Sequence, residues 1–349
     1  MRNVFIKGVP HSQFVWENIG DIEAGRGTLG DSMPVLVYRL MQHTLGHTLS
    51  ESVGSGKSDD FFRNAGSLAG TEYAKHVFTL SDGVDEFTEA AQRNLMEFNI
   101  GIDHISVVDR NTGCAVSAFD RGAGATAERP ICKYEEGLVI GIMDTYANSR
   151  FTVSENAYPD EGNTTTGGST MRNVFMKDIP HNQFTWENIG DIEGGRGELG
   201  VAMPVLVYRL MQYTMLDVLS KEFGSNKAND YFRDAGYLAG TQFSKHMLNL
   251  EVGLDEFIAN LQAKLKLLRI GILRMEAFDR ETGEIVLSVG EDLDCSGLPV
   301  TDETVCNYDE GFIAGILEAY TGKRYDVREI DCWANGDRVC RFNGKVKAA

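Results

Sequence analysis

The stretch Trp16-Glu17-Asn18-Ile19-Gly20-Asp21-Ile22-Glu23 returns without change as Trp186–Glu193. Met1–Phe5 returns in the same way as Met171–Phe175, and over the first 113 residues more than half of the positions match at a constant offset of 170. Solenoid repeats have periods of only about 20 to 50 residues, whereas about 170 residues can bury a complete core. The chain is therefore predicted to contain two copies of one domain.

The repeat divides the chain of 349 residues into three parts. Residues 1–159 form the first repeat, residues 160–170 a linker, and residues 171–349 the second repeat. The linker ends in Thr164-Thr165-Thr166-Gly167-Gly168-Ser169-Thr170, a composition typical of flexible connections. The sequence does not distinguish a natural fusion from a laboratory one.

Composition excludes several classes of protein. A formal net charge of -18 repels phosphate backbones and anionic membranes, so we expect no nucleic-acid partner and no membrane partner. No apolar run approaches the length of a membrane span, and the first residues lack the apolar core of a signal peptide. Six cysteines are too few for a disulfide scaffold. We expect a cytoplasmic globular protein.

Helices are predicted in the first part of each repeat. In the first copy one begins at Asp31 or Ser32, with Pro34 in its first turn, and a second runs from about Asp59 to Phe78. Gly66 and Gly70 lie four apart in the second helix and recur as Gly236 and Gly240. Glycine within a helix costs about 1 kcal/mol relative to alanine, so the repetition suggests a close approach to another helix or to a ligand.

Strands follow these helices. A strand-like run at Val4–Ile6 opens each repeat, and further strands flank the turns at residues 109–113 and 279–283. After a last helix, the second copy continues as a strand, an Asn335-Gly336 turn and another strand, which predicts a hairpin. This order favours an α+β fold, with helices packed on an antiparallel sheet in each of two tandem homologous domains. We expect the two domains to form an internal pseudo-dimer, because their fusion raises their effective concentration.

A candidate metal site lies near the end of the second repeat. Cys332 and Cys340 flank the hairpin turn, Glu329 precedes Cys332 by three residues, and Cys306 stands just before the last helix. Three thiolates and one carboxylate can close a tetrahedral structural zinc site, with one Zn²⁺ per chain. Three alternatives remain open: inert buried thiols, a disulfide between Cys332 and Cys340, and an iron–sulfur cluster that includes Cys295.

The segments around these residues resemble the 4-vinyl reductase domain family. The resemblance rests on residues 306–315, 327–332 and 339–342, extends over most of each repeat, and is strongest from about 208 to 342. That family includes predicted small-hydrocarbon-binding proteins and the sensory domain of phenol-responsive transcription activators. The resemblance implies that zinc is bound by Cys306, Glu329, Cys332 and Cys340, beside an aromatic pocket.

The first copy departs from this pattern. Cys132 and Glu155 remain at matching places, but Tyr158 and Thr166 stand where the second copy has Cys332 and Cys340. The segment that contains Cys295 is also four residues shorter in the first copy. We therefore predict that the first copy binds no zinc through this site.

A ligand pocket is predicted with less support from the sequence. Its candidate residues are Tyr231, Phe232, His246, Tyr320 and Trp333. Aromatic residues at helical spacing are more often part of a core, and a repeated histidine is more often a structural group. Gly54-Ser55-Gly56-Lys57-Ser58 resembles part of a phosphate-binding loop, but it follows a helix and is interpreted as a helix–helix turn.

Three functions fit these observations. The first is a zinc-containing protein that binds or senses a small hydrophobic or aromatic molecule and acts through a protein partner. The second, implied by the family name, is an enzyme or accessory factor of tetrapyrrole (chlorophyll-type) metabolism. The third is a scaffold in which the zinc is purely structural. Because no catalytic triad or dinucleotide fingerprint is recognisable, we expect a binding protein rather than an enzyme.

Overall fold

The computed structural model describes residues 9–81, 83–98, 102–109, 114–119, 133–147, 184–196 and 199–347. The described elements of the first half are η1 (Trp16–Ile19), α1 (Ile22–Gly25), β1 (Ser32–Pro34), α2 (Val35–Val53), α3 (Ser55–Val77), α4 (Val84–Glu97), β2 (Ile102–Asp109), β3 (Cys114–Phe119) and α5 (Lys133–Ala147). Those of the second half are η2 (Trp186–Ile189), α6 (Ile192–Gly195), β4 (Ala202–Pro204), α7 (Val205–Phe223), α8 (Ser225–Met247), α9 (Leu254–Leu267), β5 (Ile272–Phe278), β6 (Ile285–Gly290), α10 (Asn307–Thr321), β7 (Tyr325–Asp331), η3 (Trp333–Asn335) and β8 (Cys340–Val346).

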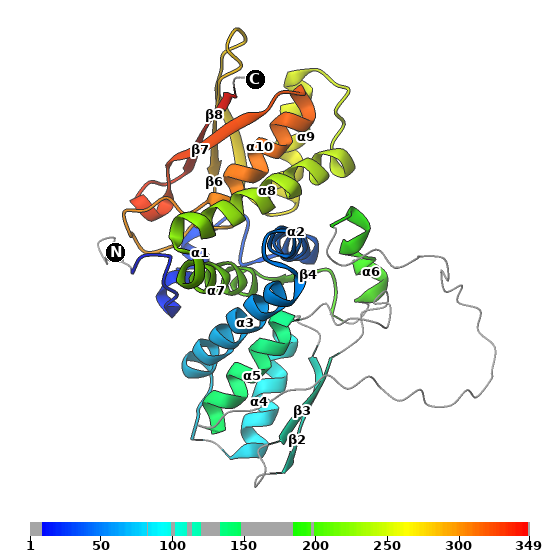
Figure 1. Cartoon of the computed structure of the whole chain (residues 1–349), viewed down its shortest axis with the longest axis vertical. Coiled ribbons are helices and arrows are strands. Elements are labelled where there is room, and N and C mark those ends of the chain that lie inside the picture. The colour runs from blue at the N-terminus through cyan, green and yellow to red at the C-terminus, as the bar shows by residue number, and fades with distance from the viewer. Residues whose placement is uncertain are drawn as a thin grey trace, which may run out of the picture.

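The second half combines helices with an antiparallel sheet. Its four strands lie in the order β5-β6-β8-β7, and every neighbouring pair is antiparallel. Helices α9 and α10 pack on this sheet, and α8 packs on α10 (Figure 1). The predicted α+β fold class is therefore confirmed.

Glycines permit the close packing of paired helices. An added Cβ at Gly236 of α8 would lie 2.0 Å from the carbonyl oxygen of Tyr308, and one at Gly240 would lie 2.0 Å from that of Phe312. Gly66 and Gly70 of α3 meet α5 in the same way, also at 2.0 Å from carbonyl oxygens. The repeated glycines thus mark backbone-to-backbone contact between helices, one of the two explanations that the sequence left open.

The two halves meet across a short strand pair. Strand β1 pairs with β4, and Met33 lies opposite its own counterpart Met203. Because equivalent residues face each other, the halves are related locally as in an isologous dimer. The sequence prediction placed Ser32 and Pro34 at the start of a helix, which is wrong: pairing holds this backbone extended, and α2 begins at Val35.

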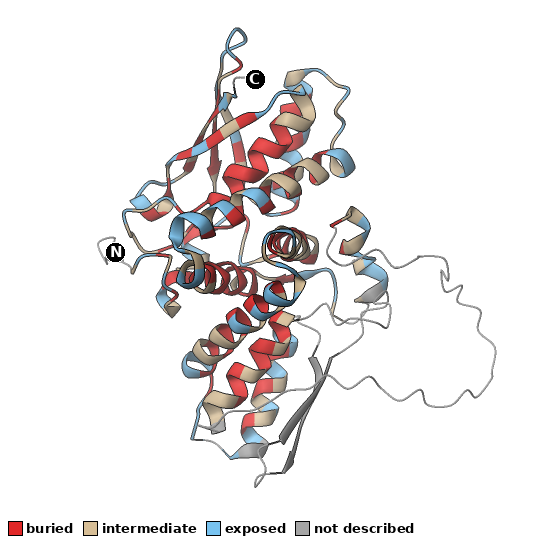
Figure 2. Cartoon of the chain, in the orientation of Figure 1, coloured by how far each residue is buried: buried red, intermediate tan, exposed pale blue. Residues whose placement is uncertain are grey.

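The long central helices cross between the halves. Helix α2 packs on α8, and α7 packs on α3, so each half contributes a helix to the other (Figure 1). Both central helices are largely buried (Figure 2). Two equivalent hydrogen bonds join these helices to the opposite half. The Tyr308 hydroxyl lies 3.2 Å from the Thr44 hydroxyl, and the Tyr134 hydroxyl lies 3.2 Å from the Thr214 hydroxyl. The division into two separate domains stays a prediction.

Several sequence predictions can be placed in this fold and others cannot. Gly54 links α2 directly to α3, so the segment that resembles a phosphate-binding loop is a helix–helix turn followed by a helix. Among the described residues, none of the helices has the length and apolar character needed to cross a membrane. The strand predicted at Val4–Ile6, the linker at 160–170, and Cys132, Glu155, Tyr158 and Thr166 lie outside the described residues.

Candidate metal centre

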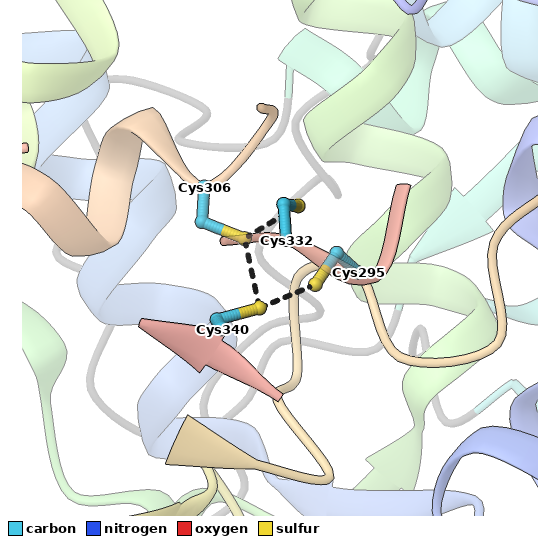
Figure 3. Close-up of side chains that lie close together, drawn as sticks. All are labelled: Cys295, Cys306, Cys332 and Cys340. Atoms are coloured by element: carbon cyan, nitrogen blue, oxygen red, sulfur yellow. Dashed lines mark hydrogen bonds between the residues drawn. The ribbon is translucent and has the colours of Figure 1, made fainter. Parts of the chain in front are cut away.

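Four cysteines converge from four places in the second half. Cys306 is the N-terminal cap residue of α10, Cys332 follows β7, and Cys340 opens β8. Strands β7 and β8 pair up to Asp331 opposite Arg341, which brings Cys332 and Cys340 to the same end of the sheet. Cys295 comes from the loop between β6 and α10 and completes the group (Figure 3).

The geometry of the sulfur atoms matches a single tetrahedral ion. The Sγ of Cys340 lies 3.0 Å from that of Cys295 and 3.7 Å from that of Cys306, and the Sγ atoms of Cys306 and Cys332 are 4.0 Å apart. All four Sγ atoms lie within 4.8 Å of one another. With zinc–sulfur bonds of about 2.3 Å, neighbouring sulfurs of a tetrahedral site are separated by roughly 3.8 Å. An iron–sulfur cluster would hold its ligands farther apart, because the cluster itself lies between them.

The four thiols are almost completely enclosed, with exposed fractions of 0 to 1%. Burial raises the pKa of Cys295, Cys306 and Cys340 well above the usual thiol range. Hydrogen bonds from these three thiols lower the pKa of Cys332. A bound cation would favour deprotonation of all four thiols.

Glu329 lies at the edge of this group. Its Oε2 accepts a hydrogen bond from the backbone N–H of Cys306 at 3.0 Å, whereas its Oε1 is buried with no hydrogen-bond partner. Burial and the nearby Cys332 raise the pKa of this carboxyl well above its usual range. The structure therefore brings Cys306, Cys332 and Cys340 together with Cys295. Glu329 contacts the backbone of Cys306, and its predicted role as a ligand stays a prediction.

Three buried aspartates surround the cysteines, and the sequence analysis did not identify them. Asp292 accepts backbone N–H bonds from Asp294 and Cys295, and burial raises its pKa. Asp309 shares a hydrogen bond with Asp292, and burial raises its pKa well above the usual value. Burial, with the charge of Asp292, raises the pKa of Asp294 to about 7. Their only sequence signal was proximity to Cys295 and Cys306.

The residues predicted to line a ligand pocket lie in different parts of the second half. Tyr231 and Phe232 are buried in α8, and the Tyr231 hydroxyl lies 2.9 Å from that of Ser52 in α2. His246 stacks on Trp186, with ring centroids 4.8 Å apart. Trp333 is half-buried and donates its indole N–H to the carbonyl of Leu298 at 3.1 Å.

Tyr320 is the one predicted pocket residue that lines the cavity of about 680 Å³ in the second half. This cavity lies between α9, the β5–β6 hairpin, α10 and β7. Its apolar lining consists of Leu254, Phe257, Ile258, Phe278, Ile285, Leu317, Tyr320 and Tyr325. Asp255, Glu256, Arg280 and Thr321 contribute polar groups. The lining therefore offers the mainly apolar surface with a few polar groups that is typical of small-molecule sites.

One family model matches part of the second half. The chain contains a V4R domain, matched over residues 285–346. This range contains Cys295, Cys306, Cys332 and Cys340, as well as Glu329. The match does not extend to the first half, so two tandem V4R domains stay a prediction.

Two curated relatives come from Methanocaldococcus jannaschii. Uncharacterized protein MJ0150 is 27% identical over 111 residues, which are 32% of this chain and 63% of that protein. Uncharacterized protein MJ1642 is 27% identical over 149 residues, which are 43% of this chain and 81% of that protein. The chain thus spans less than two thirds of the first of these relatives.

Two solved structures are similar to parts of the chain. The phenol-responsive sensory domain of the transcription activator PoxR, solved with phenol, has a TM-score of 0.33 and 17% identity, covering 37% of this chain and 69% of its own. A vinyl-4-reductase family protein from Methanocaldococcus jannaschii has a TM-score of 0.25 and 22% identity, covering 34% of this chain and 68% of its own. At these TM-scores, neither likeness carries weight for the function of this chain.

Proposed function

We propose that this protein binds or senses a small apolar or aromatic molecule, and that one structural zinc ion stabilises its second half. The observation that carries the proposal is the enclosed group of four thiols within the V4R domain. Free cysteines in a core need not meet, whereas these four come from separate segments to one point. Thiolate ligands at these separations suit Zn²⁺, which favours a tetrahedral site of nitrogen and sulfur ligands.

A single zinc ion is preferred to an iron–sulfur cluster, and a structural role to a catalytic one. The sulfur separations suit one ion, and four cysteines leave no coordination position open for water, which is the pattern of structural sites. Glu329 would then act as an outer partner that accepts the N–H of Cys306 and holds this ligand in place. If Glu329 replaces Cys295 as a ligand, the site remains closed with three sulfurs and one oxygen.

Helix α10 connects the metal site to the cavity. Cys306 caps its N-terminus, and Leu317 and Tyr320 line the cavity near its C-terminus. Fifteen residues of α-helix span about 22 Å, so the metal does not contact a ligand in the cavity. In this proposal the metal fixes the position of the helix, and the helix forms one wall of the binding site.

The wall of the cavity is held rigid by aromatic stacking. Phe257 of α9 stacks on Tyr320 of α10, with centroids 3.9 Å apart and planes inclined by 13°. The Tyr320 hydroxyl donates to the carbonyl of Val252 at 3.0 Å, which directs its polar atom to the backbone. The two rings therefore present mainly apolar surface, which favours a ligand of hydrocarbon or phenol type.

The test is a melting experiment with a panel of small phenols and hydrocarbons. A ligand that binds the folded state stabilises it by an amount that grows with the logarithm of the ligand concentration over the dissociation constant, and so raises the melting temperature. Leu254→Trp, which puts a large side chain into the cavity wall, should abolish the shift. Val84→Trp, at the matching position of the first half, should preserve it.

The outcomes separate the candidate functions. A shift that survives in Val84→Trp and disappears in Leu254→Trp supports binding in this cavity. The absence of a shift across the panel would contradict the proposal and favour a scaffold. A shift that survives in Leu254→Trp would contradict this location for the binding site.

A further inference from the structure

The N-terminal arm of the first half, residues 9–30, lies on the loop of the second half that carries Cys295. We call residues 291–306, between β6 and α10, the cysteine loop. The backbone N–H of Asp21 donates to the carbonyl of Gly297 at 2.8 Å. The Thr28 and Leu29 N–H groups donate to the carboxylate of Glu291 at 2.7 to 3.0 Å. Both ends of the loop segment around Cys295 are therefore bonded to the arm.

Glycines let the two backbones touch. An added Cβ at Gly20 would lie 2.6 Å from the carbonyl oxygen of Gly297, and one at Gly25 would lie 2.3 Å from that of Ser296. An added Cβ at Gly297 would in turn lie 2.0 Å from the carbonyl oxygen of Asp21. Side chains larger than hydrogen would separate the arm from the loop at each of these three positions.

Arg26 is the fully buried cation of this contact, with an exposed fraction of 0%. Its guanidinium donates to the carbonyl of Gly30 in its own arm at 3.1 Å, to that of Glu291 at 2.6 Å and to that of Arg269. A planar fork with five donors can hold three carbonyls at fixed angles, which an ammonium cannot do. Arg26 thus joins the arm to the start of the cysteine loop.

Arg209 of α7 fixes the same contact from the other side. It donates to the Ile19 carbonyl of the arm at 2.9 Å and to the Leu293 and Ser296 carbonyls of the loop at 2.9 and 2.8 Å. Leu293 and Ser296 stand on either side of Cys295 in the sequence. The path of the backbone around this cysteine is therefore set by contacts that include a segment of the first half.

The matching arm of the second half, residues 184–200, provides an internal comparison. Arg196 repeats the bond to its own arm, from Nε to the Gly200 carbonyl at 3.0 Å, but it is half-buried. Among the residues that the structure describes, a Cβ at Gly190, the counterpart of Gly20, would meet the side chain of Arg39, at 3.4 Å. Gly20 and Gly190 have the same backbone conformation, with φ of 76° and 74°. The described parts of the two arms share this backbone conformation and the arginine contact within the arm, and the first arm lies on the cysteine loop.

We propose that the first half acts as a clamp for the metal centre of the second half, and that Arg26 is its principal positioning residue. The arm holds the cysteine loop so that Cys295 faces the other three thiols. This inference rests on the proposed metal site. It gives the first half a role that does not require a metal site of its own.

The test compares Arg26→Ala with Arg196→Ala in the full chain loaded with Co²⁺, a spectroscopic substitute for Zn²⁺. Loss of an outer partner commonly weakens metal binding by roughly 10- to 100-fold, so Arg26→Ala should release the metal to a chelator faster by a similar factor. The thiolate-to-cobalt absorbance of Arg26→Ala should also fall by the contribution of one of the four thiolates, that of Cys295. Arg196→Ala should keep the wild-type rate of metal release and the wild-type absorbance, and Arg26→Lys should give values between those of Arg26→Ala and Arg196→Ala.

A second pair of variants separates positioning from general stability. Gly20→Ala and Gly190→Ala impose the same strain at positive φ, but only Gly20→Ala also forces the arm away from the loop. If the first half acts as a clamp, metal release should be faster in Gly20→Ala and unchanged in Gly190→Ala. Equal effects in the two glycine variants, or in the two arginine variants, would overturn it.

A readout without metal distinguishes failure of the clamp from failure of the proposed metal site. In metal-free protein, alkylation of Cys295 by iodoacetamide, followed by mass spectrometry, should be faster in Arg26→Ala than in Arg196→Ala. If alkylation is faster in Arg26→Ala but the wild-type protein binds no metal, the clamp hypothesis is retained and the proposed metal site is rejected. If alkylation is equal in the two variants and Arg26→Ala binds metal normally, the clamp hypothesis is rejected and the proposed metal site is retained.

Discussion

The two halves carry the same helical framework around different polar centres. In the first half, the Tyr38 hydroxyl donates to the carboxylate of Glu135 in α5 at 2.9 Å. In the second half, the matching Tyr208 donates instead to Asp294 of the cysteine loop at 2.8 Å. The acceptor for this tyrosine thus comes from helix α5 in the first half and from the cysteine loop in the second half.

This difference shows which parts of the repeat depend on the metal site. The glycine contacts, the crossed central helices and the stacked pair Phe87–Tyr146, equivalent to Phe257–Tyr320, persist in the half that lacks three of the four cysteines. Apolar helix packing supplies most of the stabilisation in such a framework. A cysteine site can therefore disappear from one copy while the interface between the copies is retained.

Removal of the metal should give the largest difference between the halves. Because binding to a structural site contributes directly to folding, on the order of 10 kcal/mol in small zinc domains, a strong chelator should destabilise the sheet end of the second half by several kcal/mol. Hydrogen exchange measured by mass spectrometry should show faster exchange in β7, β8 and the start of α10. Helices α3 and α5 serve as the control, and equal acceleration there would contradict the account.

Substitution of the helix-contact glycines should affect both halves alike. Gly236→Ala and Gly66→Ala each place a methyl group 2.0 Å from a carbonyl oxygen of the partner helix. Overpacking of this kind costs about 1–3 kcal/mol, and more where backbone must move. Urea unfolding should give similar losses for the two variants. A loss confined to Gly236→Ala would show that the glycine contact serves the metal site rather than the shared framework.

The smallest expected difference is in the response to pH. Burial raises the pKa of Glu135, although hydrogen bonds from Tyr38 and Gln42 oppose this shift. A carboxyl whose folded-state pKa is raised stabilises the fold below its unfolded pKa, and this contribution is lost as pH rises through the folded pKa. The first half should therefore gain stability on acidification towards about pH 4.5, the ordinary value for glutamate.

The second half should respond in the opposite direction, because thiolate ligands must be deprotonated and acid releases the metal. Hydrogen exchange at several pH values can follow both halves in one sample. Glu135→Gln should flatten the profile of the first half and leave that of the second unchanged. An unaltered profile in α3 and α5 would rule out Glu135 as the cause.

The sequence predicted features that depend on local pattern or on the internal repeat. The α+β class, the close approach at Gly236 and Gly240, and the convergence of Cys306, Cys332 and Cys340 follow from periodicity, glycine spacing and strand pairing. The start of α2 was mispredicted because Pro34 is equally compatible with a first helical turn and with the end of a strand. Only the other half, through Met203, decides between them.

Long-range contacts account for what the sequence analysis missed. Cys295 entered only as part of an iron–sulfur alternative, because its distance from Cys340 along the chain gives no sign of the 3.0 Å between their sulfurs. Arg26 stands between two glycines in the sequence, and its two partners in the second half lie more than 240 residues away. A repeat alignment compares copies with each other and cannot show that one lies against the other's loop.

The central claim is that the second half alone holds a structural zinc ion, and the direct test is the metal content per chain of protein purified without added metal. We expect one zinc per chain in the wild-type protein and in Cys132→Ser, and none in the Cys332→Ser/Cys340→Ser double variant. Iron with visible absorbance, or no bound metal in the wild-type protein, would contradict this claim.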